Sequence, residues 1–351
     1  MSSVLSLARP DILQLQPYQH ATWDPSLERM HANEMPWRAQ GDNSAAGLNR
    51  YPEPQPKVLV DRMAQLYGVP ASRVLVGRGS DEAIDLLVRA FCRAGQDGVV
   101  ICPPTFGFYK VAAKIQGAQV IEVPLRRDGF ALDTEAVIAA GRTAKIVFLC
   151  SPNNPTGNLL DEPAMLRICR ELATTSLVCV DEAYIEFAGR PSLSARLDEF
   201  PNLVLLRTLS KAYALAGARL GTLIASEEIV NLLKRIIPPY AIPASTVEDV
   251  LRLTEAPQRA SSAARIQALI EERGRMQARL AKMPMVVRQL PSDANFLLVE
   301  FRDARAALES GKSTGLLVRD FSTAPGLTNC LRISIGTPDQ NERLMAALER
   351  P

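Results

Sequence analysis

Histidine is nearly absent from this chain, which has only two among its 351 residues, His20 and His31. So few histidines exclude a histidine-rich metal site and catalysis that needs several of them. An excess of charge of one sign is absent too, because 40 Lys and Arg residues stand against 38 Asp and Glu residues. The net charge of +2 therefore indicates neither a nucleic-acid partner nor a basic patch for a membrane surface.

Closely spaced cysteines and long apolar runs are also missing. No two of the six cysteines are closer than ten residues, which excludes the CxxC pairs of zinc sites. Several lie in apolar runs, as Cys102 and Cys179 do, so we expect buried, reduced thiols. No run approaches the ~20 apolar residues of a membrane span, and the N-terminus lacks the basic and apolar segments of a signal peptide. The sequence thus predicts a protein of the reducing cytoplasm.

What is present is an ordinary globular composition, with 47% hydrophobic and 22% charged residues, in a chain long enough for two domains. Between about residues 55 and 235, short runs rich in Val, Ile and Leu alternate with amphipathic helical stretches. This alternation predicts an α/β domain with a seven-stranded, mostly parallel sheet flanked by helices. The seven runs are Val74–Val76, Val99–Cys102, Val120–Val123, Ile146–Cys150, Leu177–Val180, Leu203–Leu206 and Leu220–Ala225.

The last third has a different pattern. Pro238 and Pro239 interrupt the alternation, and a long helical stretch follows at about 256–283. Short strands are then predicted at 286–290, 295–301, 316–318 and 331–335, before a final helix near 338–349. This order indicates a smaller α+β domain. We expect residues 1–45 to form an N-terminal arm and part of the small domain, 46–237 the large domain and 238–351 the small C-terminal domain.

Four polar motifs follow four of the predicted strands. The first, Gly77-Arg78-Gly79-Ser80-Asp81-Glu82, opens a helix and presents backbone N–H groups that suit an anion, although Ser80 or Asp81 could simply cap that helix. Glu82 occupies the place of the third glycine of a dinucleotide-binding fingerprint, which argues against a nicotinamide cofactor. The second motif, Ser151–Gly157, is a loop that two prolines make rigid; it is either a tight turn only or a support for a ligand-binding amide.

The third motif, Asp181-Glu182-Ala183-Tyr184, places a carboxylate directly after a buried strand, where it needs a cation unless it caps a helix. The fourth is Arg207-Thr208-Leu209-Ser210-Lys211, with Arg219 eight residues later. Desolvation and a neighbouring positive charge both lower the pKa of a lysine, and a neutral amine is the nucleophile that forms a Schiff base. The alternative for Lys211 is a solvated surface position.

The joint order of the motifs says more than any one of them. Carboxyl ends of parallel strands meet at one edge of a sheet, so an anion site, an amide, a carboxylate and a lysine would converge there. A ligand that needs all four is a phosphorylated, cationic aromatic ring with a carbonyl group. Pyridoxal 5′-phosphate (PLP) has these features.

At these motifs the sequence resembles the fold-type I PLP-dependent aminotransferases, and within them the histidinol-phosphate aminotransferases. Further matches are Asn49-Arg50-Tyr51-Pro52, Pro103-Pro104-Thr105-Phe106 and Leu331-Arg332-Ile333-Ser334, so the resemblance extends from about residue 30 to 340. It implies a homodimer in which Tyr51 reaches the cofactor of the other subunit; the charge balance given above leaves nucleic acid and membrane out as expected partners. Phe106 stands where the family often has tyrosine and can still stack on the ring.

The resemblance also implies a role for each matched residue. Lys211 would bind PLP covalently and shuttle protons, Asp181 would pair with the ring nitrogen, and Tyr184 would assist at the ring oxygen. The implied cofactor-binding residues are Tyr51, Ser80, Asp81, Phe106, Asn154, Asp181, Tyr184, Thr208, Ser210, Lys211 and Arg219. The implied substrate-binding residues are Asn154, Arg319 and Arg332, and Tyr18, Asn33 and Phe296 either line the substrate pocket or are packing residues.

The implied reaction moves the amino group of L-histidinol phosphate to 2-oxoglutarate, giving imidazole acetol phosphate and L-glutamate in histidine biosynthesis. An aromatic amino acid aminotransferase of the same subgroup is the alternative, and a PLP-dependent phosphothreonine decarboxylase is a further one. No metal is implied.

Overall fold

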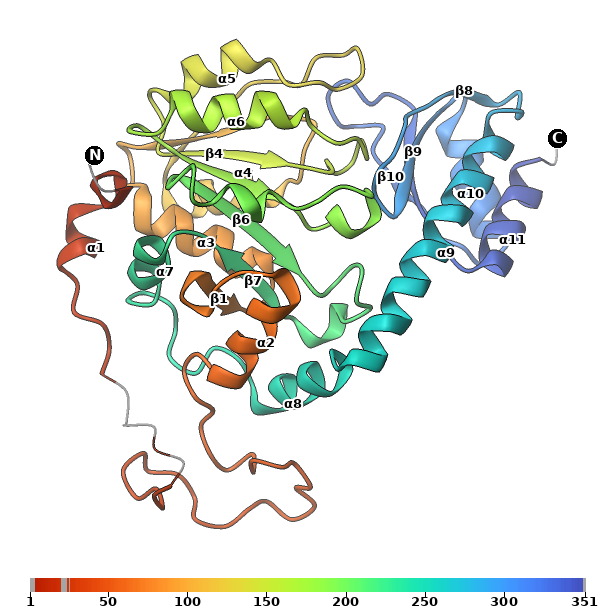
Figure 1. The fold of residues 1–351 in the computed structure, drawn as a ribbon. Helices are drawn as coiled ribbons and strands as arrows, with labels where there is room; N and C mark the ends of the chain where they lie inside the picture. Colours follow the sequence, from red (N-terminus) through yellow and green to blue (C-terminus); the bar gives the residue numbers. More distant parts are fainter. Residues whose placement is uncertain (1–3, 20–23, 25, 350–351) are drawn as a thin grey trace.

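The computed structural model describes residues 4–19, 24 and 26–349, and its larger part is built on a seven-stranded sheet (Figure 1). The strand order is β1-β7-β6-β5-β4-β2-β3, and only β7 runs against its neighbours. The expected seven-stranded, mostly parallel sheet is therefore confirmed. The strands are β1 (Val74–Gly77), β2 (Gly98–Ile101), β3 (Gln119–Glu122), β4 (Ile146–Cys150), β5 (Leu177–Asp181), β6 (Leu203–Thr208) and β7 (Gly221–Ile224).

Two apolar cores cover the two faces of this sheet. In β4, Val147 and Leu149 pack into one core, whereas Ile146 and Phe148 pack into the other. Because both of its faces are buried, β4 is apolar throughout and does not alternate with polar residues. One core contains α2 (Lys57–Tyr67), α5 (Thr134–Gly141) and α6 (Glu162–Glu171); the other contains α3 (Ser80–Phe91), α4 (Phe108–Gln116) and α7 (Glu227–Leu233).

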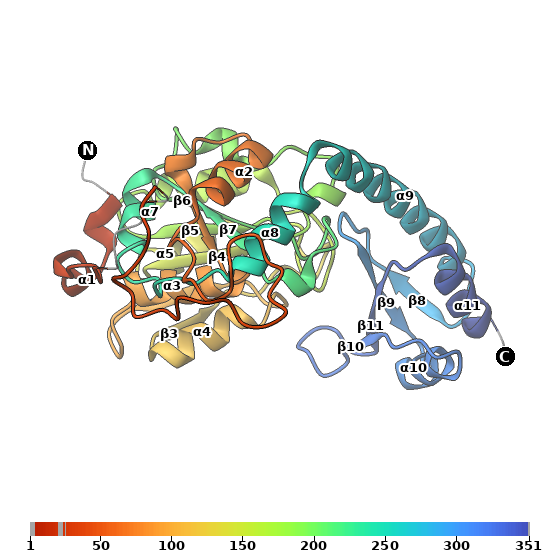
Figure 2. The same cartoon turned by 90° about the horizontal axis from the view of Figure 1, so that it is seen from below.

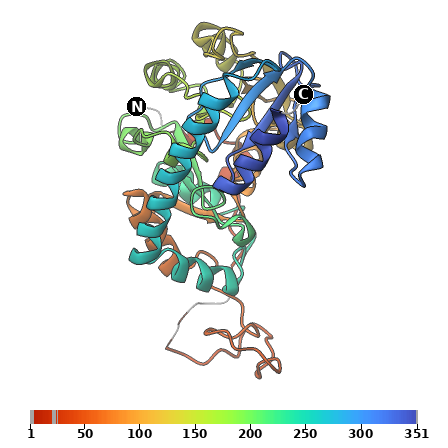
Figure 3. The same cartoon turned by 90° about the vertical axis from the view of Figure 1, so that its right-hand side faces the viewer.

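The N-terminal segment packs on the large sheet domain. The short helix η1 (Val4–Leu7) joins the core under α3 and α7, and the Arg9 N–H donates to the Ala90 carbonyl at 2.9 Å, just before α1 (Pro10–Gln14). Residues 26–56 then form an arm without helix or strand that extends away from both domains (Figures 1 and 3). Domain boundaries at residues 45 and 237 stay a prediction.

The small domain is built on a four-stranded antiparallel sheet in the order β10-β11-β9-β8, reached through the long helix α9 (Figure 2). The strand expected at 316–318 is wrong: β10 forms directly after that range, because Arg319 and Asp320 are the residues that pair with β11. Leu316 and Val318 instead pack on the small-domain core. The elements from residue 244 onward are α8 (Ala244–Leu253), α9 (Ala256–Leu280), β8 (Val286–Gln289), β9 (Phe296–Phe301), α10 (Ala304–Ser313), β10 (Arg319–Asp320), β11 (Cys330–Ser334) and α11 (Pro338–Leu348).

The large domain also has four short 3₁₀ helices: η2 (Ala71–Arg73), η3 (Ile185–Phe187), η4 (Leu193–Arg196) and η5 (Ala216–Ala218).

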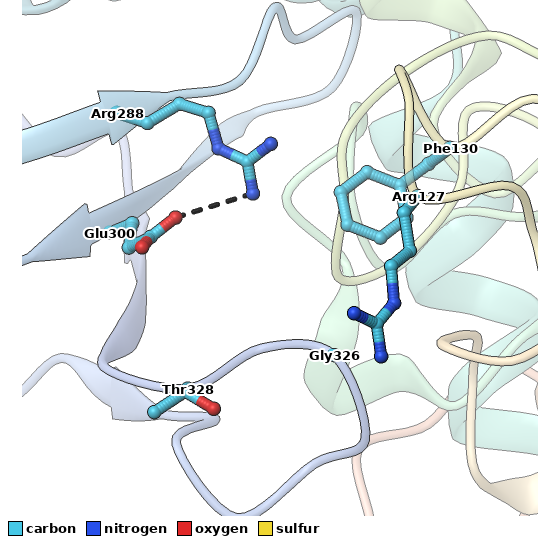
Figure 4. A pocket seen from close by; sticks show the side chains of 6 residues that line it. All are labelled: Arg127, Phe130, Arg288, Glu300, Gly326 and Thr328. Atoms are coloured by element: carbon cyan, nitrogen blue, oxygen red, sulfur yellow. Dashed lines mark ion pairs between the residues drawn. The ribbon is translucent and has the colours of Figure 1, made fainter.

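Hydrogen bonds tie the two domains together beside the loop that follows β4. The Asp293 N–H donates to the Gly157 carbonyl at 2.7 Å, and the Asp293 carboxylate accepts from the Leu159 N–H at 3.1 Å. Elsewhere the domains face each other across a cavity of about 380 Å³, shown in Figure 4. Its lining residues are Arg127 and Phe130 of the large domain, and Arg288, Glu300, Gly326 and Thr328 of the small domain.

Within the ranges that the structure describes, none of the helices has both the length and the apolar character needed to cross a bilayer.

The close approach of β7 to the turn before α3 yields a prediction. A Cβ at Gly221 would lie 2.2 Å from the carbonyl carbon of Gly79 and 2.3 Å from the Ser80 nitrogen, both of them backbone atoms. We expect Gly221→Ala to lower the free energy of unfolding by about 1–3 kcal/mol, because the backbone must move to admit the methyl group. Urea unfolding of the purified protein measures this. Gly274→Ala, where a Cβ meets nothing within 4 Å, is the control; equal stability of the two variants would contradict the prediction.

Candidate active site

The four motifs meet in one cavity of about 620 Å³ at the carboxyl edge of the large sheet, where the small domain covers it. Asp181 is the last residue of β5 and Thr208 the last residue of β6, so neighbouring parallel strands deliver them to the same edge. The lining residues are Gly79, Ser80, Asp81, Thr105, Phe106, Gly107, Cys150, Asn154, Asp181, Ala183, Tyr184, Thr208, Ser210, Lys211, Ala216, Arg219, Arg319, Phe321 and Arg332.

The turn before α3 makes one end of the cavity suitable for an anion. Gly79 has a φ of +84°, and α3 begins at Ser80 with no side chain capping it. The alternative interpretation, in which the Ser80 or Asp81 side chain caps this helix, is therefore wrong. The Arg219 guanidinium lies 3.4 Å from the Asp81 carboxylate, and the Thr208 and Ser210 hydroxyl oxygens are 3.0 Å apart. Helix N–H groups, hydroxyls and a guanidinium are the donors that bind phosphate groups.

Asp181 is a buried carboxylate with two hydrogen bonds. It is 3% exposed, its Oδ2 accepts from the Tyr109 hydroxyl at 2.7 Å, and its Oδ1 accepts from the Ala183 N–H at 3.1 Å. Burial raises the pKa of this carboxyl to about 6, although the two hydrogen bonds favour the charged form. Asp181 does not cap an α-helix, because only a single 3₁₀ turn, η3, follows it. A buried carboxylate with a raised pKa in a cavity is typical of a functional group.

Lys211 lies in the same cavity, after β6, with its Nζ 5.7 Å from the centre of the Tyr184 ring. Lys211 remains solvent-exposed, but partial desolvation in the cavity lowers the pKa of its ammonium; the charge of Arg332 lowers it further, while Asp181 opposes the shift. The sequence indicated Arg219 as the neighbouring charge; Arg332, from the other domain, contributes more. The neutral amine is thus more accessible at a given pH than for an ordinary lysine.

A hydrogen bond between Arg332 and Asn154 joins the two domains across the cavity. The Arg332 guanidinium, on β11, donates to the Asn154 side-chain oxygen, and the Asn154 amide lies 3.5 Å from the Tyr184 hydroxyl. Two aromatic rings hold the guanidinium, Phe296 at 5.3 Å and Phe321 at 5.2 Å. Arg319 is the residue of β10 that pairs with Arg332, so two guanidiniums reach one wall. Such a pair suits an acidic ligand.

Three residues that the resemblance assigned to the site lie outside this cavity. Tyr51 is 51% exposed and stacks on Tyr240 with ring centres 4.7 Å apart. Asn33 lies exposed on the arm, and Tyr18 lines a separate groove beside Pro238 and Pro239. A single chain therefore brings none of these three to Lys211.

Sequence reasoning missed Tyr109 and Phe321. Tyr109 lies in a predicted helix and Phe321 follows a short strand, and neither has a motif that signals its contact with the site. All six cysteines are buried and free, as expected. No group of three or more His, Cys, Asp or Glu side chains suited to a metal ion occurs among the residues that the structure describes.

Known proteins share both the sequence and the fold. A family model, aminotransferase class I and II, matches residues 26–348. The chain is 45% identical to a histidinol-phosphate aminotransferase of Stenotrophomonas maltophilia, over 99% of this chain and 97% of that protein. A histidinol-phosphate aminotransferase of Sinorhizobium meliloti, solved with pyridoxal-5′-phosphate, has a TM-score of 0.77 and 27% identity over 86% of this chain and 82% of its own.

A protein of different chemistry has the same fold. The L-threonine-O-3-phosphate decarboxylase of Porphyromonas gingivalis has a TM-score of 0.73 and 25% identity over 86% of this chain and 93% of its own. The fold alone therefore does not select the reaction. The family match over most of the chain and the near-full-length similarity do confirm the resemblance seen in the sequence: the chain belongs to the class I and II aminotransferases.

Proposed function

We propose that this chain is a PLP-dependent aminotransferase that moves the amino group of L-histidinol phosphate to 2-oxoglutarate, giving imidazole acetol phosphate and L-glutamate in histidine biosynthesis. The observation that carries the proposal is the 45% identity, along nearly the whole chain, to a histidinol-phosphate aminotransferase. The cavity supports it independently, because it holds a lysine, a buried carboxylate and three arginines. These are the groups that a phosphorylated aldehyde cofactor and acidic substrates require.

The donors that line the cavity fit the chemistry of pyridoxal phosphate. A Cβ at Gly79 would lie 2.8 Å from the Arg219 guanidinium, so any larger residue would fill the space beside the first turn of α3. This space, with the helix N–H groups around it, is where we place the phosphate. The proposed phosphate-binding residues are Ser80 and Asp81, through their backbone, and Thr208, Ser210 and Arg219.

When bound, pyridoxal phosphate supplies an aldehyde carbon that bonds to amines and a ring that accepts electrons from the carbon next to the amine. Lys211 is the proposed covalent partner, since its lowered pKa provides a neutral nucleophile. The Lys211 Nζ would also be the base that takes the proton from the substrate carbon bearing the amine. Asp181 would hold a proton on the ring nitrogen. Asn154 and Tyr184 would bind the ring oxygen, and Phe106 would cover the ring.

Arg332 is the proposed anchor for the acidic group of each substrate. Its guanidinium already binds an oxygen, the Asn154 side-chain carbonyl, and it lies over the rings of Phe296 and Phe321. A carboxylate or phosphate would take two of its N–H groups in a fork, which a lysine cannot reproduce. Arg319 would add a second positive charge for a phosphate.

A homodimer is part of the proposal. The stretch from Asn49 to Pro56 has three prolines, which keep it extended and stiff. The arm carries large exposed side chains, with Met30 97% and Trp37 75% exposed, as expected of a surface that a partner covers. We propose that a second copy receives this arm and that Tyr51, with Tyr18 and Asn33, completes the other subunit's site.

The six free thiols support a reducing compartment, and we propose the cytoplasm.

A panel of single substrates tests the proposed reaction. PLP-loaded protein is mixed with one amine at a time, and the rate at which the cofactor's visible absorption changes is recorded. L-histidinol phosphate should react faster than any aromatic amino acid. A faster aromatic amino acid would favour the alternative aminotransferase, and release of carbon dioxide from phosphothreonine would favour a decarboxylase.

Lys211→Ala should lose turnover by about 10⁴-fold or more, because the nucleophile and the proton carrier are the same amine. Borohydride reduction of the loaded wild-type protein should attach the cofactor to the peptide containing Lys211, as read by mass spectrometry. The exposed Lys282→Ala variant is the control and should keep both properties. Near-normal turnover of Lys211→Ala would contradict the assignment.

Arg332→Lys keeps the positive charge and loses the fork, so the apparent KM should rise for both the phosphorylated amine and the 2-oxo acid. A loss of about 1.5–3 kcal/mol per substrate is typical of a charged hydrogen bond. Steady-state kinetics with each substrate varied in turn measure this, with Arg305→Lys, at an exposed position, as control. A defect for one substrate only would mean that different residues bind the two acidic groups.

Mixing two nearly inactive variants tests the shared site. If Tyr51 serves the other subunit, a heterodimer of Tyr51→Phe and Lys211→Ala chains has one site with both lesions and one with neither. Each heterodimer should then have up to half the activity of a wild-type dimer. No recovery after proven subunit exchange would show that Tyr51 acts within its own chain.

A further inference from the structure

Tyr109 is a fully buried tyrosine that no step of the proposed reaction uses. It is the second residue of α4, it is 0% exposed, and it does not line the cavity. A buried phenol needs a hydrogen-bond partner. The partner of Tyr109 is the Asp181 carboxylate, whose Oδ2 accepts its hydroxyl at 2.7 Å.

Two hydrogen-bond donors hold the Asp181 carboxylate in place. The Ala183 N–H holds Oδ1 and the Tyr109 hydroxyl holds Oδ2, one donor for each oxygen. Because an ionised carboxylate has about four acceptor positions, each oxygen keeps capacity for a further donor. Because Asp181 lines the cavity, its remaining acceptor positions can take a hydrogen bond from a ligand bound there.

The ring of Tyr109 is itself fixed on two sides. It stacks on Phe148 of β4 with ring centres 4.9 Å apart and planes 3° apart. Its other contact is an edge-on one to Phe106, at 5.4 Å and 84°, and Phe106 lines the cavity. Close packing of this kind leaves the hydroxyl little freedom to turn away from Asp181.

We propose that Tyr109 is a positioning residue for Asp181: its hydroxyl keeps the carboxylate ionised and oriented toward the ring nitrogen of PLP, and its ring supports Phe106. This inference rests on the proposed function, in which Asp181 pairs with that nitrogen.

The charges around Asp181 set the direction of the effect. The titratable groups that face it are Tyr109, Cys150, Cys179, Tyr184, Asp81 and Lys211. Burial raises the pKa of the Tyr109 phenol well above its ordinary value, so the hydroxyl keeps its proton and stays a donor at neutral pH. A donor favours the ionised carboxylate and lowers its pKa; removing the hydroxyl raises that pKa above its present value of about 6.

The experiment compares cofactor affinities in the whole protein without any turnover. Dissociation constants are measured by equilibrium dialysis for pyridoxal phosphate and for an analogue in which a C–H group replaces the ring nitrogen. Both ligands keep the aldehyde and the phosphate, so the ratio of the two constants isolates the contact with Asp181. The proteins compared are the wild type, Tyr109→Phe, Asp181→Asn and Tyr67→Phe. Tyr67 is the matched control, because it is a buried tyrosine that neither contacts Asp181 nor lines the cavity.

We expect Tyr109→Phe to reduce the preference for pyridoxal phosphate over the analogue on the order of tenfold to a hundredfold. With falling pH, its remaining preference should disappear at a higher pH than in the wild type. Tyr67→Phe should keep the wild-type ratio. Suppose Tyr109→Phe has the wild-type ratio and pH profile while Asp181→Asn has a reduced ratio. This result would overturn the role of Tyr109 and leave the assignment of Asp181 in place. A wild-type ratio in Asp181→Asn as well would overturn the assignment of Asp181 on which the inference rests.

Discussion

The pairing of three parallel strands, β4, β5 and β6, is the constraint on which the site depends. In this register Cys150 lies opposite Asp181, and Asp181 lies opposite Leu206. Helices bury both faces of these strands, so polar side chains are tolerated only where the strands end. A shift by one residue would turn Asp181 to the opposite face of the sheet. Register and burial together therefore decide which side chains reach the cavity.

Two successive buried carboxylates at the end of β5, Asp181 and Glu182, have different kinds of partners. Glu182, 2% exposed, accepts from the Ser192 hydroxyl and the Leu193 N–H and lies 3.5 Å from the Arg207 guanidinium. Asp181 has no arginine partner and faces the cavity with only neutral donors behind it. A buried ion pair mainly serves the fold, whereas a buried carboxylate left open toward a cavity serves a ligand. The difference between these neighbours is visible only in three dimensions.

The strands and the cavity motifs could be predicted because their cause is local. Strands buried on both faces are continuous apolar runs, so β4 was located at Ile146–Cys150 to the residue. The strand β10 was misplaced because two residues without an apolar pattern form it through their pairing with β11. Tyr109 escaped prediction since a tyrosine in an apolar helix resembles any core residue until its partner is known. Arg332 was found through its motif, yet its effect on the pKa of Lys211 depends on how two domains meet.

The Arg332–Asn154 hydrogen bond has a consequence for how such an enzyme can diversify. The anion turn, Asp181 and Lys211 belong to the large domain, whereas Arg319, Phe321 and Arg332 belong to the small one. Mutations in the small domain can therefore reshape the wall that meets the acidic group while the anion turn and the lysine keep their mutual geometry. A fold shared by transaminases and a decarboxylase is what such a division allows.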